Sequence, residues 1–96
     1  MTATTDFMLK LRRIDDMKVI ARDVLILWAC RAKPGMMGME LALSLGYASR
    51  SVVQTRIRIL CEMGLLDDRR KIRGPKTPND LHITAAGSKF LDELLA

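Results

Sequence analysis

The sequence has little of the chemistry on which most enzymes and metal sites depend. Its 96 residues include only two cysteines and one histidine. These are fewer ligands than a structural zinc site needs, and Cys30 and Cys61 stand in no CxxC or Cys/His pattern. Neither GxxxxGK[ST] nor GxGxxG occurs, which excludes the common phosphate-binding loops. We interpret Asp67-Asp68 as charge at a strand edge rather than as a general acid and base. We therefore expect no enzymatic activity, no cofactor and no metal.

Long apolar runs are lacking as well. The longest, residues 24–30, is too short to cross a membrane, and the N-terminus lacks the basic and then apolar stretch of a signal peptide. We expect a cytoplasmic protein with reduced thiols and no membrane partner. With 49% hydrophobic and 28% charged residues, the chain can bury a core, and we predict a single domain over residues 1–96.

The chain has a net positive charge, and this charge is confined to one third of the sequence. Residues 47–79 carry eight basic and three acidic side chains, so this segment holds the whole net charge of +5 while the remainder is neutral. This distribution favours an anionic partner, most often nucleic acid. The alternative is a solvated basic face that binds nothing.

The spacing of apolar residues and of helix stop signals predicts the order of the elements. After an N-terminal arm or short helix over residues 1–14, we expect helices over 17–33, 38–45 and 49–63, with Ser49 as the N-cap of the last. An extended segment at 67–72 and a strand at 81–83 flank a turn-rich loop, and Thr84 caps a final helix to about residue 94. The fold class is α+β, mainly α, in the order helix, helix, helix, strand, wing, strand, helix.

The helix over 17–33 has two apolar stripes, which predicts burial on most sides. One stripe contains Met17, Ile20, Val24, Leu27 and Trp28, and the other contains Val19, Ile26 and Cys30. We assign the first stripe, with Trp28, to the core of the chain. The second stripe is then available for self-association together with the apolar face of the N-terminal arm. The predicted homodimer interface consists of Phe7, Leu11, Ile14, Val19 and Ile26.

Two short helices joined by a Gly-containing turn, followed by a basic hairpin, are typical of a winged helix-turn-helix. Residues 39–66 resemble this part of the multiple-antibiotic-resistance-type (MarR-like) repressors, through Leu60-x-x-x-Gly64-Leu65-Leu66 and then Leu81-x-Ile83-Thr84-x-x-Gly87. The resemblance covers about residues 36–95, with the helix-turn-helix and wing over 36–83, and implies a DNA-binding fold. The chain departs from the family at Arg56, where an apolar residue is common, so we expect this guanidinium to reach outward. It also has no counterpart of the long flanking helices that build the family's dimer.

The helix over 49–63 has the surface that a recognition helix needs. If Leu60 faces the core, so do Val53 and Ile57, and the opposite face is polar. Arginine and glutamine can read base edges, and hydroxyls reach bases or phosphates. The predicted DNA contacts of this helix are Ser49, Arg50, Ser51, Gln54, Thr55 and Arg58. The alternative is that this face is polar only because it is exposed to solvent, and that it binds no DNA.

The predicted wing is strongly basic, which suits the DNA backbone or the minor groove. Its candidate contacts are Arg69, Arg70, Lys71, Arg73 and Lys76. Alternation places Arg69, Lys71 and Arg73 on one side and Arg70 on the other; a solvated loop that prevents edge pairing is the alternative. Tyr47 either contacts a phosphate or anchors the turn. His82 has no partner pattern, and we expect an exposed or loosely bonded imidazole.

These features lead to two hypotheses. The first is a sequence-specific double-stranded DNA-binding protein, a homodimeric transcriptional repressor or autoregulator. The second is a winged-helix module that binds another protein, such as a small phage or plasmid inhibitor of a nucleic-acid machine. In that case the basic residues meet an acidic groove.

Overall fold

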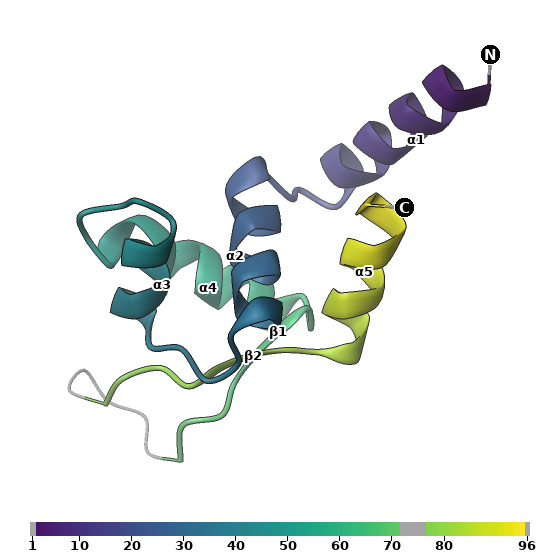
Figure 1. The fold of residues 1–96 in the computed structure, drawn as a ribbon. Coiled ribbons are helices and arrows are strands. Elements are labelled where there is room, and N and C mark those ends of the chain that lie inside the picture. Colours follow the sequence, from purple (N-terminus) through teal and green to yellow (C-terminus); the bar gives the residue numbers. More distant parts are fainter. Residues whose placement is uncertain (1, 72–76, 96) are drawn as a thin grey trace.

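The computed structural model describes residues 2–71 and 77–95 (Figure 1). Within these two ranges, five helices and two strands follow the predicted order, and the mainly helical winged-helix class is confirmed. Their bounds are α1 Thr2–Asp16, α2 Ala21–Ala32, α3 Gly38–Ser44, α4 Ser51–Glu62, β1 Leu66–Asp68, β2 Leu81–Ile83 and α5 Ala85–Leu95. No helix within the described ranges is long and apolar enough to cross a bilayer.

The small sheet closes the end of the core. β1 and β2 pair antiparallel, with Leu66 opposite Ile83 and Asp68 opposite Leu81, and Met36 forms a further bridge to Leu81. The strand predicted at 81–83 is confirmed. The extended segment predicted at 67–72 forms a strand only from Leu66 to Asp68. One backbone bond follows, from the Arg69 N–H to the Asp80 carbonyl at 2.8 Å, but the Asp80 N–H donates to the Asp68 carboxylate at 3.1 Å and not to a backbone carbonyl of β1.

Helix α2 lies at the centre of the fold, and the assignment of its two stripes was only partly right: Leu27 of the first stripe is wholly buried, as predicted, but the second stripe is buried as well. Val19 and Ile26, 4% and 0% exposed, are buried together with Cys30 against the other helices and β2, so they are core residues and are not available to a dimer partner. Trp28, predicted in the core, is 54% exposed, and Ile20 is also exposed. The physical reason is that α4, α5 and β2 pack against the side of α2 that carries Ile26 and Cys30.

The helical conformation is interrupted between α1 and α2, although a helix was predicted to begin at residue 17. Lys18 adopts a left-handed conformation with φ of 59°, and Ile20 is extended. The Asp23 carboxylate then accepts a hydrogen bond from the Ile20 N–H at 2.9 Å and caps α2. As a result α1 is a separate helix that projects from the remainder of the molecule (Figure 1). The described residues, α1 included, measure 51 × 26 × 22 Å.

The junction of β2 with α5 confirms the predicted cap. The Thr84 hydroxyl oxygen accepts from the Gly87 N–H at 2.9 Å and donates to the Gly64 carbonyl at 2.7 Å. One side chain thereby begins α5 and ties it to the turn that follows α4. Gly64 itself has φ of 77°, a conformation that suits glycine.

Candidate nucleic-acid interface

The polar face of α4 is oriented by its apolar face. Val53, Ile57 and Leu60 are buried in the core, as predicted. On the other side Arg50, Ser51, Thr55 and Arg58 are exposed and Gln54 is half-buried. An open hollow of about 580 Å³ is lined by Ser49, Arg50, Ser51, Gln54 and Thr55, with Met39 from α3. Five of the six predicted recognition residues are therefore gathered on one surface.

The start of α4 presents two serine hydroxyl groups beside Arg50. The helix begins at Ser51, two residues after the predicted cap, and the Ser49 hydroxyl accepts from the Ser51 N–H at 3.2 Å. The hydroxyls of Ser49 and Ser51 lie 2.8 Å apart. The N–H groups of Ser51 and Val52 are bonded to Ser49, so the hydroxyls and the positive end of the helix dipole are what favour an anion here. This end of α4 can therefore receive a phosphate oxygen.

Gly38 makes room for Arg50, a role that sequence reasoning missed. A Cβ at Gly38 would lie 3.2 Å from Cδ of Arg50 and 2.8 Å from Oδ1 of Asn79. The Arg50 stem therefore crosses directly over the first residue of α3, beside the base of the wing. Only a residue without a side chain leaves this space, and the signal was the glycine itself at the start of a predicted helix.

Arg58 lies one turn further along α4, next to the wing. It forms an exposed ion pair with Glu62 at 3.0 Å. A second hollow, of about 320 Å³, runs between α4 and the base of the wing. Its lining includes Gln54, Arg58, Asp68, Arg70 and Asn79. The recognition face and the wing are thus parts of one continuous surface.

Asp68 organises the base of the wing, so its interpretation as edge charge was wrong, whereas Asp67 is exposed as expected. Besides two backbone N–H groups, Asp68 accepts from Nδ2 of Asn79 at 2.8 Å and pairs with Nε of Arg70 at 3.0 Å. Burial alone would raise the pKa of Asp68, but the hydrogen bonds and the Arg70 charge outweigh it and lower that pKa below its usual value.

The basic residues of the wing divide into two groups. Arg70 is mostly buried and donates to the Thr77 carbonyl at 2.9 Å, so its guanidinium holds the hairpin, a role that the sequence did not indicate. Arg69, paired with Asp67 at 3.2 Å, and Lys71 are exposed. This matches the predicted alternation as far as the structure describes it. Arg73 and Lys76 lie outside the described residues.

Three further residues show how the surroundings of the interface are built. Tyr47 packs on the core with the Arg22 guanidinium 5.3 Å from its ring centroid, which makes it an anchor of the turn; a phosphate contact stays a prediction. His82 lies with Nε2 2.8 Å from Oδ1 of Asp80, so its imidazole is bonded locally.

Arg56 does not reach outward as predicted: its Nε donates to Oδ1 of buried Asp23 at 2.7 Å. This hydrogen bond raises the pKa of Arg56 above its usual value.

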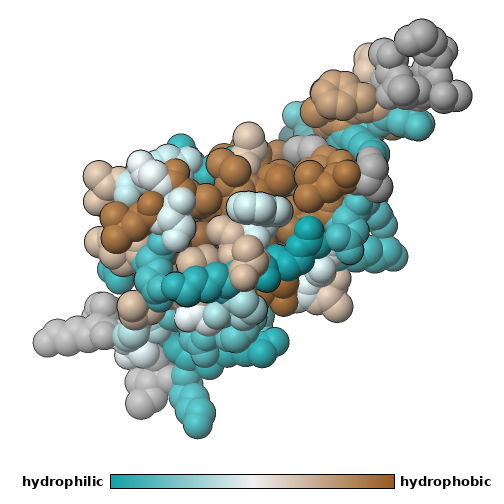
Figure 2. Space-filling model, in the orientation of Figure 1, coloured by the Kyte–Doolittle hydropathy of each residue, from teal (hydrophilic) through white to brown (hydrophobic). Residues whose placement is uncertain are grey.

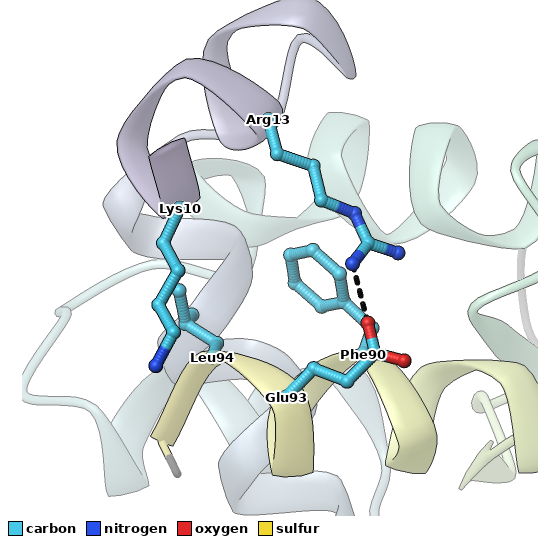
Figure 3. A pocket seen from close by; sticks show the side chains of 5 residues that line it. All are labelled: Lys10, Arg13, Phe90, Glu93 and Leu94. Carbon is cyan, nitrogen blue, oxygen red and sulfur yellow. Dashed lines mark hydrogen bonds and ion pairs between the residues drawn. The ribbon is translucent and has the colours of Figure 1, made fainter. Parts of the chain in front are cut away.

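The opposite end of the molecule exposes apolar side chains. Phe7, Met8, Leu9 and Leu11 of α1 are exposed, and Figure 2 shows hydrophobic residues on α1 and across the centre of the molecule, above a hydrophilic lower end. The side chain of Ile14 lies outside the described part of the chain. Helix α1 contacts α5 through a cluster around a cavity of about 20 Å³ (Figure 3). The cluster consists of Lys10, Arg13, Phe90, Glu93 and Leu94, with an ion pair between Arg13 and Glu93.

Neither protein-family models nor curated protein sequences match this chain. Solved structures do. The PcaV transcriptional regulator from Streptomyces coelicolor is 24% identical with a TM-score of 0.67, over 79% of this chain and 52% of that one. The multiple antibiotic-resistance repressor (MarR) from Listeria monocytogenes 4b F2365 is 14% identical with a TM-score of 0.73, over 88% of this chain and 56% of that one.

A third neighbour is the transcriptional repressor CouR bound to a 23-mer DNA duplex. It is 21% identical with a TM-score of 0.69, over 98% of this chain and 65% of that one. The chain thus spans between about half and two thirds of the length of these regulators. At these identities the likeness concerns the fold, and the predicted resemblance to MarR-like winged helices is confirmed at that level.

Proposed function

We propose that the protein binds double-stranded DNA sequence-specifically, as a homodimer, and regulates transcription as a repressor or autoregulator. The observation that carries this proposal is the polar face of α4, whose side chains are gathered around one hollow by a buried apolar face. Arg50 and Gln54 have the chemistry to read guanine and adenine, and the hydroxyls at the helix start suit phosphate. The winged-helix likeness to DNA-bound CouR supports it.

The wing extends the same surface. Arg69 and Lys71 are exposed on either side of Arg70 in the chain, and Arg70 lines the hollow that joins α4 to the hairpin. In this proposal a duplex lying along α4 reaches both. Both side chains have the charge for phosphate contacts, which fix position rather than sequence. Arg70 supports the hairpin from inside.

The homodimer rests on α1. Phe7 and Leu11, two of the predicted interface residues, are exposed on a helix that leaves the body of the molecule. Two-fold symmetry would present two α4 helices to half-sites about 34 Å apart, one helical turn of DNA. A palindromic preferred sequence is the expected consequence.

The test begins with selection of bound sequences from random duplex DNA. The affinity for the selected site should fall steeply with salt, because phosphate contacts release counterions. Arg50→Ala with Gln54→Ala should lower that affinity at least about tenfold and abolish the sequence preference, since a good base contact is worth about 1–3 kcal/mol. The control is Arg12→Ala on α1, which removes a charge at an exposed site elsewhere.

Three results would contradict the proposal: no duplex affinity in the wild type, a flat salt response, or an unchanged sequence preference in the double variant. Absence of duplex binding together with specific binding to an acidic protein would instead support the protein-interaction module.

A further inference from the structure

A buried ion pair behind the recognition helix connects three parts of the chain. Asp23, in the first turn of α2, is wholly buried. Its Oδ2 accepts from the Ile20 N–H at 2.9 Å, and its Oδ1 accepts from Nε of Arg56 at 2.7 Å. Nη2 of Arg56 donates to Oδ2 of Asp23 as well, and to the Lys18 carbonyl at 3.3 Å. One carboxylate and one guanidinium therefore join α4 to α2 and to the junction between α1 and α2.

The position of Arg56 on α4 gives this pair its importance. Arg56 follows Gln54 and Thr55 of the recognition face directly, but its side chain turns back towards α2 and is only 18% exposed. A second contact from the same end of α2 reaches the start of α4, where Nη1 of Arg22 donates to the Val52 carbonyl at 3.3 Å. The N-terminus of α2 thus holds α4 at two successive turns.

Removal of Arg56 would leave the buried Asp23 carboxylate without its counter-charge, which proteins tolerate poorly. Any change in the direction of α1 must pass through residues 17–20, where Ile20 and the Lys18 carbonyl are bonded to this pair. Movement of the junction and movement of α4 are therefore opposed by the same hydrogen bonds.

We propose that Asp23 and Arg56 are positioning residues for DNA binding, which fix the orientation of α4 relative to the α1–α2 junction and so couple the recognition face to the placement of α1. The inference rests on the proposed function. Coupling of this kind is reciprocal: whatever fixes α1 favours one orientation of α4, and DNA on α4 stabilises the junction.

The DNA test uses a variant that can keep the fold. Asp23→Asn with Arg56→Gln replaces the ions by two amides that can still bond to each other and to the Ile20 N–H. Under conditions where circular dichroism shows it folded, affinity for the selected site should fall about tenfold or more. The slope of log affinity against log salt should stay unchanged, because each lost phosphate contact lowers that slope by about 0.9.

The matched control is Arg31→Gln with Asp92→Asn, which removes the 2.7 Å ion pair between α2 and α5, away from α4. It should leave affinity within about twofold, since ion pairs this exposed contribute little. An unchanged affinity in the folded Asp23/Arg56 variant would overturn the proposal. So would a slope lower by about one unit, because Arg56 would then touch phosphate itself.

A second measurement needs no DNA. In the free protein, hydrogen exchange of the Ile20 amide should be slow, as in α4. In Arg56→Gln the amides of residues 17–20 and of the middle of α4 should lose protection together, while α5 keeps its protection. Loss at only one of the two places would show that the pair does not couple them. This result stands even if the wild type binds no duplex, so failure of the coupling and failure of the proposed function are distinguishable.

Discussion

Gly87 lies against Leu65 so closely that a Cβ on Gly87 would sit 2.1 Å from the Leu65 carbonyl oxygen. The same carbonyl accepts a hydrogen bond from the Thr84 N–H at 3.2 Å. The first turn of α5 is therefore pressed onto the chain that enters β1. This contact is a physical reason why the motif Leu81-x-Ile83-Thr84-x-x-Gly87 ends with glycine.

Gly87→Ala should destabilise the protein, although alanine is the better helix former by about 1 kcal/mol. The added methyl meets a backbone oxygen and the Ile83 side chain, so α5 must shift, and overpacking of this kind costs about 1–3 kcal/mol. Urea unfolding measures the change. The neighbouring exposed Ala86→Gly serves as the control for propensity alone. A Gly87→Ala variant more stable than the wild type would refute the contact.

Asp68→Asn should weaken the fold at neutral pH and reduce its sensitivity to acid. The pKa of Asp68 is lowered in the folded state, so its stabilising contribution is present above the usual carboxyl pKa of about 3.9 and is lost as the pH falls below it. We expect a loss of about 1–3 kcal/mol at pH 7, since a charged hydrogen-bond acceptor is replaced. Denaturant unfolding from pH 7 to pH 2 measures both effects. Asp67→Asn, at an exposed carboxylate, should change neither.

The two kinds of wing arginine should separate experimentally. Arg69→Ala with Lys71→Ala should leave the free energy of unfolding within about 0.5 kcal/mol of the wild type. The double change should weaken DNA binding uniformly across sequences and lower the slope of log affinity against log salt by about 1.8, the loss of two phosphate contacts. Arg70→Ala should instead lower the melting temperature, because Asp68 loses its counter-charge. Equal effects of both changes on stability would contradict this division.

Cys30 should resist alkylation in the folded protein. Burial, and to a lesser extent the nearby Cys61, raise the pKa of Cys30 to about 12, so its thiolate is absent at pH 8. Iodoacetamide followed by mass spectrometry should find Cys30 unmodified until denaturant is added, and the Cys61→Ser variant should stay unmodified when native. Because the unfolded thiol ionises first, the contribution of Cys30 to stability should fall between about pH 9 and pH 12. Rapid native labelling of Cys30 would disprove its burial.

Charge on α1 should dissociate the proposed homodimer. Phe7 and Leu11, 61% and 48% exposed, should tolerate glutamate in the monomer, so Phe7→Glu with Leu11→Glu should yield a folded monomer by sedimentation velocity. Leu43→Glu on α3, also at 61% exposure, is the matched control and should stay dimeric. A wild type that sediments as a monomer at all concentrations would remove the dimer from the proposal.

Much of the interface could be predicted from the sequence because α4 has one apolar stripe. Val53, Ile57 and Leu60 can face only one way, and their burial leaves Arg50 and Thr55 outside. Strand 81–83 and the Thr84 cap follow equally from local pattern and turn chemistry. Local spacing was sufficient wherever an element had a single apolar side.

Helix α2 has two apolar stripes, and its local spacing is the same whichever of them is buried. Ile26 faces the core and Trp28 the solvent because α4, α5 and β2 pack on one side of the helix. The sequence by itself thus determined the order of elements, the inward face of α4 and the segment that holds the net charge. Only the tertiary structure decided which face of α2 is covered, that Arg56 pairs with Asp23 at a separation of 33 residues, and that Gly38 makes room for Arg50. These three features depend on side chains that come together from distant parts of the chain. Periodicity describes only residues that are close in the sequence, so it does not predict such contacts.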